Sequence, residues 1–230
     1  MIIIFDIDGT LCRTSGVDDD CWRRAASDVL GVKEMTTDWG AYPHSTDEAI
    51  GCELIRRRFG SEADPDLLGH LRDRFVELLL EARAGSPDLF RPTPGAAELL
   101  RRLQGMGRHV AIATGGWRRS ALLKLKTSGI PHDGLPAAFA DDAHPRETII
   151  RIARQRAADA VGLSADSLGA GVYVGDGLWD LRASGVLGMG FVGIAEGSRA
   201  RALEAAGART VMSDFLDSDR FVAALEASAT

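Results

Sequence analysis

Two carboxylates stand directly after the first apolar run of the chain. Asp6 and Asp8 follow Ile2–Phe5, and Gly9 comes next. Residues two apart in an extended chain point to the same side, and Gly9 permits the turn that follows. Two carboxylates about 4 Å apart repel by roughly 4 kcal/mol at an effective dielectric constant near 20. The pair is therefore either a turn pair with a capping role or part of a site that binds a cation.

Polar groups also follow two later apolar runs. A Thr-Gly-Gly turn, residues 114–116, comes after the run 110–113, and Asp176 and Asp180 come after the run 172–174. A hydroxyl group and free backbone N–H groups at a helix N-terminus bind phosphate oxygens, although the same turn is also an ordinary strand-to-helix connection. Asp176 and Asp180 would share one helix face, or else act as an N-cap and a surface acid. Oxygen ligands without a nearby His or Cys suit Mg²⁺.

The apolar runs predict the elements that position these groups. Further short runs occur at residues 191–194 and, more weakly, 137–140. Helical patterns lie between the runs, at residues 96–106, 118–128, 146–158 and 198–206. Continuous apolar strands that alternate with helices are typical of an α/β fold, a parallel sheet covered on both faces. Ligands of such sheets bind beyond the carboxyl ends of the strands, where the polar groups above would converge.

Residues 13–92 have a different pattern, with helical stretches that each end at a glycine, at residues 21–31, 45–60 and 64–85. Three prolines in residues 86–95 indicate a return linker. We therefore predict an α/β core domain made of residues 1–12 and 93–230. A helical cap domain, residues 13–92, is inserted after the first strand.

Two of these helices have start signals. Ser45 with Glu48 fits a capping box. Asp64 followed by Pro65 fits an N-cap with proline at the first helical position.

Composition and charge exclude several kinds of partner. With 230 residues, of which 45% are hydrophobic, the chain is globular and holds one large core or a core with a smaller domain. A net charge of −6 argues against nucleic acid and against an anionic membrane. The sequence contains no apolar run of the roughly 18 residues that a membrane span needs. Cys12, Cys21 and Cys52 lack metal-ligand spacing and indicate free thiols of a cytoplasmic protein.

Three motifs carry a family resemblance. "DIDGTL" at 6–11, "ATGG" at 113–116 and "GDGLWD" at 175–180, in that order, resemble those of the haloacid dehalogenase (HAD) superfamily of phosphohydrolases. The inserted helical stretch resembles the type-1 cap of phosphoglycolate-phosphatase-like members. The resemblance implies a three-layer, Rossmann-like core and a Mg²⁺-dependent hydrolase that acts on a small phosphorylated metabolite.

The resemblance also implies roles for individual residues. Asp6 matches the nucleophile that forms an aspartyl-phosphate, and Asp8 matches the general acid and base. Mg²⁺ would be held by Asp6, by the backbone carbonyl of Asp8 and by Asp176. Asp180 would orient a metal-bound water or a basic side chain. The transferring phosphoryl group would be held by Thr114 and Gly115.

One motif departs from the family pattern. The family supplies a lysine in a Gly-Lys-Pro context that is absent here, and lysine occurs only at positions 33, 124 and 126. Lys124 is about eight residues into its helix and is expected roughly 12 Å from the phosphate end at 1.5 Å per residue. We therefore assign the basic group to Arg146, which can bind phosphate through two N–H groups. The alternative is that Arg146 is an ordinary residue of a first helical turn.

Other functions share parts of this pattern. A phosphomutase would use the same residues. A dehalogenase usually lacks the second aspartate, and a phosphonate-cleaving enzyme needs a cap lysine, for which Lys33 shows no sign of burial. A non-catalytic phosphate-binding protein would not need the full set of acids. The sequence does not indicate which metabolite is the substrate or what the oligomeric state is.

Overall fold

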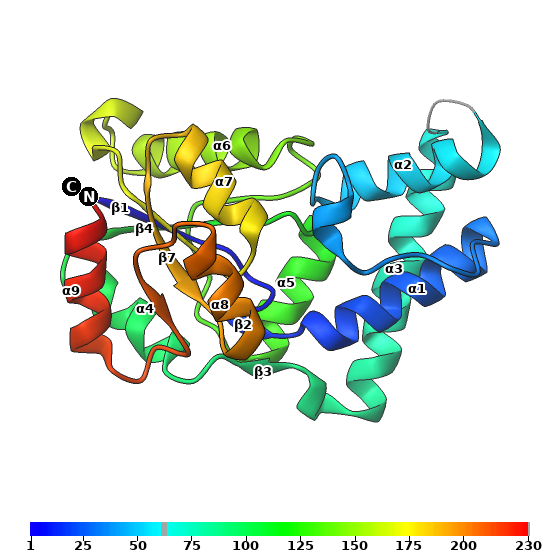
Figure 1. Cartoon of the computed structure of the whole chain (residues 1–230), viewed down its shortest axis with the longest axis horizontal. Coiled ribbons are helices and arrows are strands. Elements are labelled where there is room, and N and C mark those ends of the chain that lie inside the picture. The colour runs from blue at the N-terminus through cyan, green and yellow to red at the C-terminus, as the bar shows by residue number, and fades with distance from the viewer. Residues whose placement is uncertain (61–63, 230) are drawn as a thin grey trace.

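The computed structural model describes residues 1–60 and 64–229 and contains a parallel β-sheet (Figure 1). Within these residues the sheet has six strands in the order β5-β4-β1-β6-β7-β8. The strands are β1 (Ile2–Phe5), β4 (His109–Ala113), β5 (Ala137–Ala138), β6 (Val172–Gly175), β7 (Gly190–Ile194) and β8 (Val211–Met212). All adjacent strands are parallel, so their carboxyl ends meet at one edge. No helix of the described part is long and apolar enough to cross a membrane.

Helices cover both faces of the sheet. One face packs against α4 (Ala96–Gly105), α5 (Arg118–Thr127) and α9 (Ser218–Ser228). The other packs against α6 (Arg146–Ala160), α7 (Leu178–Val186) and α8 (Gly197–Ala205). Side chains of β1 alternate between the faces: Ile3 and Phe5 join the first core, and Ile2 and Ile4 join the second. The predicted three-layer α/β fold is confirmed.

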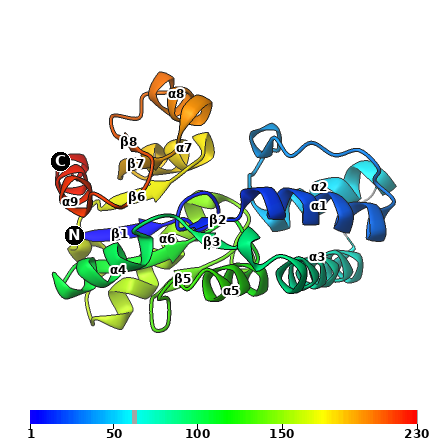
Figure 2. The same cartoon turned by 90° about the horizontal axis from the view of Figure 1, so that it is seen from below.

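Residues 15–60 and 64–85, here called the helical segment, stand to one side of the sheet (Figures 1 and 2). They contain α1 (Ser15–Leu30), α2 (Asp47–Phe59) and α3 (Pro65–Gly85). The chain leaves and re-enters the sheet layers at one place, because β2 (Cys12–Arg13) pairs antiparallel with β3 (Arg91–Pro92). Short 3₁₀ turns occur at Trp39–Ala41, Pro87–Leu89 and Ala165–Leu168.

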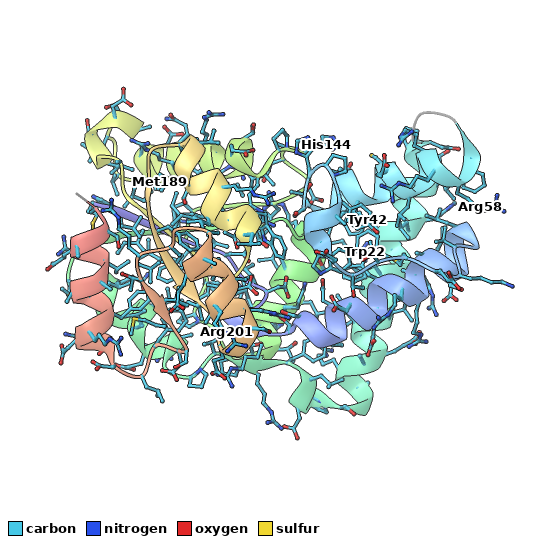
Figure 3. All side chains as sticks on the ribbon, in the orientation of Figure 1. Trp22, Tyr42, Arg58, His144, Met189 and Arg201 are labelled. Carbon is cyan, nitrogen blue, oxygen red and sulfur yellow. The ribbon has the colours of Figure 1, made fainter. Side chains whose placement is uncertain are left out.

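The helical segment has its own apolar core, which continues into the sheet layers. Trp22, labelled in Figure 3, stacks on Trp117 at 5.1 Å between ring centroids and packs on Phe75 at 5.4 Å. Trp22 and Phe75 belong to α1 and α3, whereas Trp117 precedes α5. Aromatic packing of this kind adds to the burial of apolar area and holds the helical segment against α5.

One of the two predicted helix starts is confirmed. The Asp64 carboxylate accepts a hydrogen bond from the backbone N–H of Asp66, and Pro65 opens α3. The capping box of Ser45 and Glu48 is wrong. Thr46 is the N-cap of α2 and makes no side-chain cap bond. Both residues of the predicted box instead bond to distant groups: Ser45 Oγ donates to the Trp39 carbonyl, and Glu48 accepts from Arg72 and from the Trp117 indole.

Candidate active site

The carboxyl edge of the sheet forms the floor of a cavity of about 300 Å³, and the helical segment forms the facing wall. Asp6 follows β1, Thr114 follows β4 and Asp176 follows β6, so the parallel topology brings together residues that are far apart in sequence. All three line the cavity, together with Asp8, Gly115 and Arg146. Asp180, in the first turn of α7, is fully buried.

Three carboxylates cluster below this cavity. One oxygen from each of Asp6, Asp176 and Asp180 lies within 4.8 Å of the others, and all three residues are buried. Burial, followed by the nearby Asp180 charge, raises the pKa of Asp6 from 3.8 to about 7. The pKa of Asp176 is also raised, first by burial and then by Asp180 and Asp6. Buried oxygen ligands whose charges repel one another fit a hard divalent cation such as Mg²⁺.

Gly9 makes this cluster sterically possible. Its φ of +77° is costly for any residue with a side chain, and a Cβ atom there would lie 2.0 Å from Asp176 Oδ2. The glycine after the two acids in the sequence therefore has two functions. It makes the turn, and it leaves room for the third carboxylate.

Arg146 is the cation of the cluster. Its Nη1 lies 3.0 Å from Asp180 Oδ1 and 3.4 Å from Asp6 Oδ1. The Nη2 atom donates to the backbone carbonyl of Ser45 at 2.6 Å. Burial acts to lower the pKa of Arg146, but Asp180 and Asp6 more than offset it, so that pKa is raised. The alternative of an ordinary first-turn residue is wrong, because the guanidinium is buried between acids from two strand ends and the helical segment.

Asp180 is not a surface acid. Its Oδ1 pairs with Arg146, and its Oδ2 accepts from the backbone N–H of Gly177 at 3.0 Å. Both oxygens are thus already bonded to the protein. Arg199 makes a further pair at the cavity mouth, 3.2 Å from Asp176 Oδ2, and is largely exposed.

The Thr-Gly-Gly turn closes around the same guanidinium. Thr114 Oγ1 accepts from the Gly116 N–H at 3.2 Å. A Cβ atom on Gly115 would lie 2.3 Å from Arg146 Nη2 and 2.6 Å from the Ser45 carbonyl oxygen. Only a glycine allows the turn, Arg146 and the helical segment to approach this closely.

The helical segment is bonded to this turn through Asp47. The Asp47 N–H donates to the Gly115 carbonyl at 2.7 Å, and Asp47 Oδ2 accepts from the Trp117 N–H at 2.8 Å. Asp47 Oδ1 accepts from the Trp22 indole at 2.9 Å. No sequence pattern indicates this role of Asp47, because an acid in the first turn of a helix is common.

A further hydrogen bond joins the helical segment to the loop before α6. Thr46 Oγ1 donates to the carbonyl of His144, which is labelled in Figure 3 next to the start of α6. Residues 45–47 therefore contact both loops that supply the Thr-Gly-Gly turn and Arg146.

The expectation that Lys124 lies too far from the site is wrong. Its Nζ donates to Asp8 Oδ2 at 2.6 Å, and the side chain is 1% exposed. The helical rise gives the position of the Cα atom only. Helix side chains lean toward the N-terminus of the helix, so the long lysine side chain carries Nζ several ångströms closer to the site than its Cα atom.

The family model for haloacid dehalogenase-like hydrolases matches residues 1–188. The chain belongs to this family. No protein with a curated description matches the hydrolase.

Solved structures share its fold. A hydrolase from Pseudomonas syringae is 21% identical, with 96% of this chain and 97% of that chain covered and a TM-score of 0.71. CbbY from Rhodobacter sphaeroides, in complex with phosphate, is 22% identical with 98% of both chains covered and a TM-score of 0.66. A predicted phosphoglycolate phosphatase from Haemophilus somnus 129PT is 18% identical, with 96% and 97% covered and a TM-score of 0.61.

Substitution of Gly115 by alanine tests the close approach at the Thr-Gly-Gly turn. The new methyl group must displace Arg146 or Ser45, so we expect Gly115→Ala to lower the free energy of unfolding by about 1–3 kcal/mol. Urea denaturation measures this. Gly105→Ala, at a helix position with open space around the glycine, is the control and should be neutral or stabilising. Equal stabilities of the two variants would contradict the tight packing.

The raised pKa of Asp6 predicts an inverse dependence of stability on pH in metal-free protein. The folded state keeps a proton on Asp6 up to about pH 7, whereas the unfolded chain releases it near 3.8. Stability should therefore fall as the pH rises through this window.

Asp6→Asn removes that effect. In EDTA at pH 8 we expect the variant to be more stable than wild type by about 1–3 kcal/mol, with the gap closing near pH 4. Thermal melts across pH measure this, and Asp88→Asn, an exposed acid, is the control. Parallel stability curves for wild type and Asp6→Asn would contradict the prediction.

Proposed function

We propose that this hydrolase is a Mg²⁺-dependent phosphatase that removes the phosphoryl group from a small phosphorylated metabolite. One observation carries the proposal: carboxylates from β1 and β6 lie within reach of a single ion, with a buried arginine beside them in the same cavity. Transfer of a phosphoryl group needs positive charge beside its oxygens and a nucleophile aligned with phosphorus. The cavity of about 300 Å³ suits a small substrate.

Asp6 is the nucleophile in this proposal. One of its carboxylate oxygens attacks phosphorus in line, the bond between phosphorus and the leaving alcohol oxygen breaks, and an aspartyl-phosphate forms. Asp8 gives its proton to the leaving oxygen. Asp8 then takes a proton from a water molecule whose oxygen attacks phosphorus. The bond between phosphorus and the Asp6 oxygen breaks, inorganic phosphate leaves, and the Asp6 carboxylate is restored.

The same proposal assigns Mg²⁺ to the carboxylates of Asp6 and Asp176 and to the backbone carbonyl of Asp8. The ion supplies positive charge for the phosphoryl oxygens. Asp180 acts through Arg146, which it holds by a short ion pair. The geometry supports this division, because Asp6 and Asp176 line the cavity, whereas Asp180 is fully buried beneath the cavity lining.

Thr114, the backbone of Gly115 and Arg146 bind the phosphoryl oxygens in this proposal. Residues 13–92 form a cap domain over a core of residues 1–12 and 93–230. The cap excludes water and selects the leaving group. The pairing of β2 with β3 supports a hinge at this boundary, since both connecting strands lie side by side.

A panel of phosphorylated metabolites and p-nitrophenyl phosphate, assayed for released inorganic phosphate with and without Mg²⁺, tests the function. We expect EDTA to abolish turnover and Asp6→Asn to reduce kcat by at least about 10³-fold. Full activity of Asp6→Asn would exclude it as the nucleophile, and activity that survives chelation would exclude the metal role. Isomerised sugar phosphate in place of inorganic phosphate would indicate a mutase.

Arg146 is tested by Arg146→Ala and Arg146→Lys. We expect Arg146→Ala to lower kcat/KM by about 10²–10³-fold, because it removes the positive charge next to the phosphoryl group. Arg146→Lys keeps the charge but cannot reach Asp6, Asp180 and the Ser45 carbonyl together, so it should recover only part of the loss. Arg154→Ala is the control. Arg154 also lies on α6, but its guanidinium donates to the backbone carbonyls of Ala165 and Gly169. Unchanged kinetics in Arg146→Ala would place the basic group elsewhere.

A further inference from the structure

Lys124 is a buried cation with acidic partners on two different elements. Its Nζ donates to Asp8 Oδ2 at 2.6 Å, in the loop after β1, and to Asp18 Oδ1 at 2.5 Å, in the first turn of α1. The Phe75 ring of α3 lies 5.9 Å from the same atom, where α3 runs next to α5 (Figure 2). Burial of an unpaired ammonium costs several kcal/mol, so this lysine depends on its two acids.

Two hydrogen bonds hold the Asp8 carboxylate, one at each oxygen. Lys124 holds Oδ2, and the hydroxyl of Thr14, which is fully buried, donates to Oδ1 at 2.6 Å. A carboxylate with a short bond on each oxygen has one orientation about its last side-chain torsion. Each oxygen keeps a second lone-pair direction. Asp8 lines the cavity and can therefore meet a substrate atom while both bonds persist.

Two further acids lie near Lys124 and make different contacts: Asp47 is buried, and the Asp18 side chain is 13% exposed. Asp18 has Lys124 as its ion-pair partner and belongs to the helical segment. Asp47 bonds the Trp22 indole and the Trp117 N–H instead. Asp18 is therefore the second carboxylate, besides Asp8, that pairs with the ammonium.

We propose that Lys124 is a positioning residue for Asp8, and that Asp18 of the helical segment keeps the Lys124 ammonium in place. This inference rests on the proposed phosphatase function, in which Asp8 protonates the leaving group. The ion pairs of Lys124 are with Asp8 and Asp18, not with the two carboxylates assigned to Mg²⁺, Asp6 and Asp176. Its effect is confined to the step in which Asp8 transfers a proton.

A comparison of leaving groups separates this role from a general structural one. An alkyl phosphate needs a proton on its leaving oxygen, whereas p-nitrophenolate leaves readily as the anion. We expect Lys124→Met to lower kcat/KM by about 10–100-fold for the alkyl phosphate hydrolysed fastest in the panel above. The same variant should change kcat/KM for p-nitrophenyl phosphate by less than about threefold, because that ester needs little acid catalysis.

Asp8→Asn provides the second comparison. Addition of Lys124→Met to Asp8→Asn should cause no further loss on the alkyl ester, because residues that act through one group are not additive. Lys126→Met is the matched control, since Lys126 is an exposed lysine of the same helix. If Lys124→Met fails to fold, Lys124→Met/Asp18→Asn removes both charges of that buried pair and allows the same test.

The outcomes are distinct. Equal losses on both esters, or additive losses in the double variant, overturn the positioning role while the phosphatase function stands. Absence of hydrolysis across the panel by wild type, or full activity of Asp6→Asn, overturns the function itself.

Discussion

The site depends on the repulsion among buried carboxylates at one edge of the sheet. Parallel strands bring Asp6, Asp176 and Asp180 within 4.8 Å of one another, in surroundings where like charges cost several kcal/mol. A fold that only needed stability would place apolar side chains there. The cost is tolerated because a cation can offset it, and this makes the edge suited to a charged ligand.

The protein offsets part of this charge with two buried cations that have different geometries. Arg146 is planar and reaches three partners at once: Asp6, Asp180 and the Ser45 carbonyl. Lys124 is a compact charge that bridges Asp8 and Asp18. Each cation joins the sheet edge to the helical segment. The cations that neutralise acids at the sheet edge therefore also bond the helical segment to that edge.

Much of the fold and part of the site could be predicted from the sequence, for a physical reason. Short apolar runs identify buried parallel strands. Because the residues that follow such strands lie at one edge of the sheet, Asp6, Thr114 and Asp176 could be placed together without coordinates. Arg146 could be found because it opens a helix after a strand. The placement of the strand ends uses backbone periodicity, which is local in sequence, whereas the search for a basic group such as Arg146 also needs the family resemblance.

The missed features depend on side-chain reach and on long-range competition. The helical rise describes only the Cα atom of Lys124, whose side chain extends back along α5 to Asp8. The capping box is wrong because Ser45 bonds Trp39 in the preceding loop, and Glu48 finds partners in Arg72 and Trp117, which are distant in sequence. Both errors occur where the helical segment meets the sheet edge. At that boundary local rules compete with contacts that only the assembled fold supplies, and there the side chains that complete the site are found.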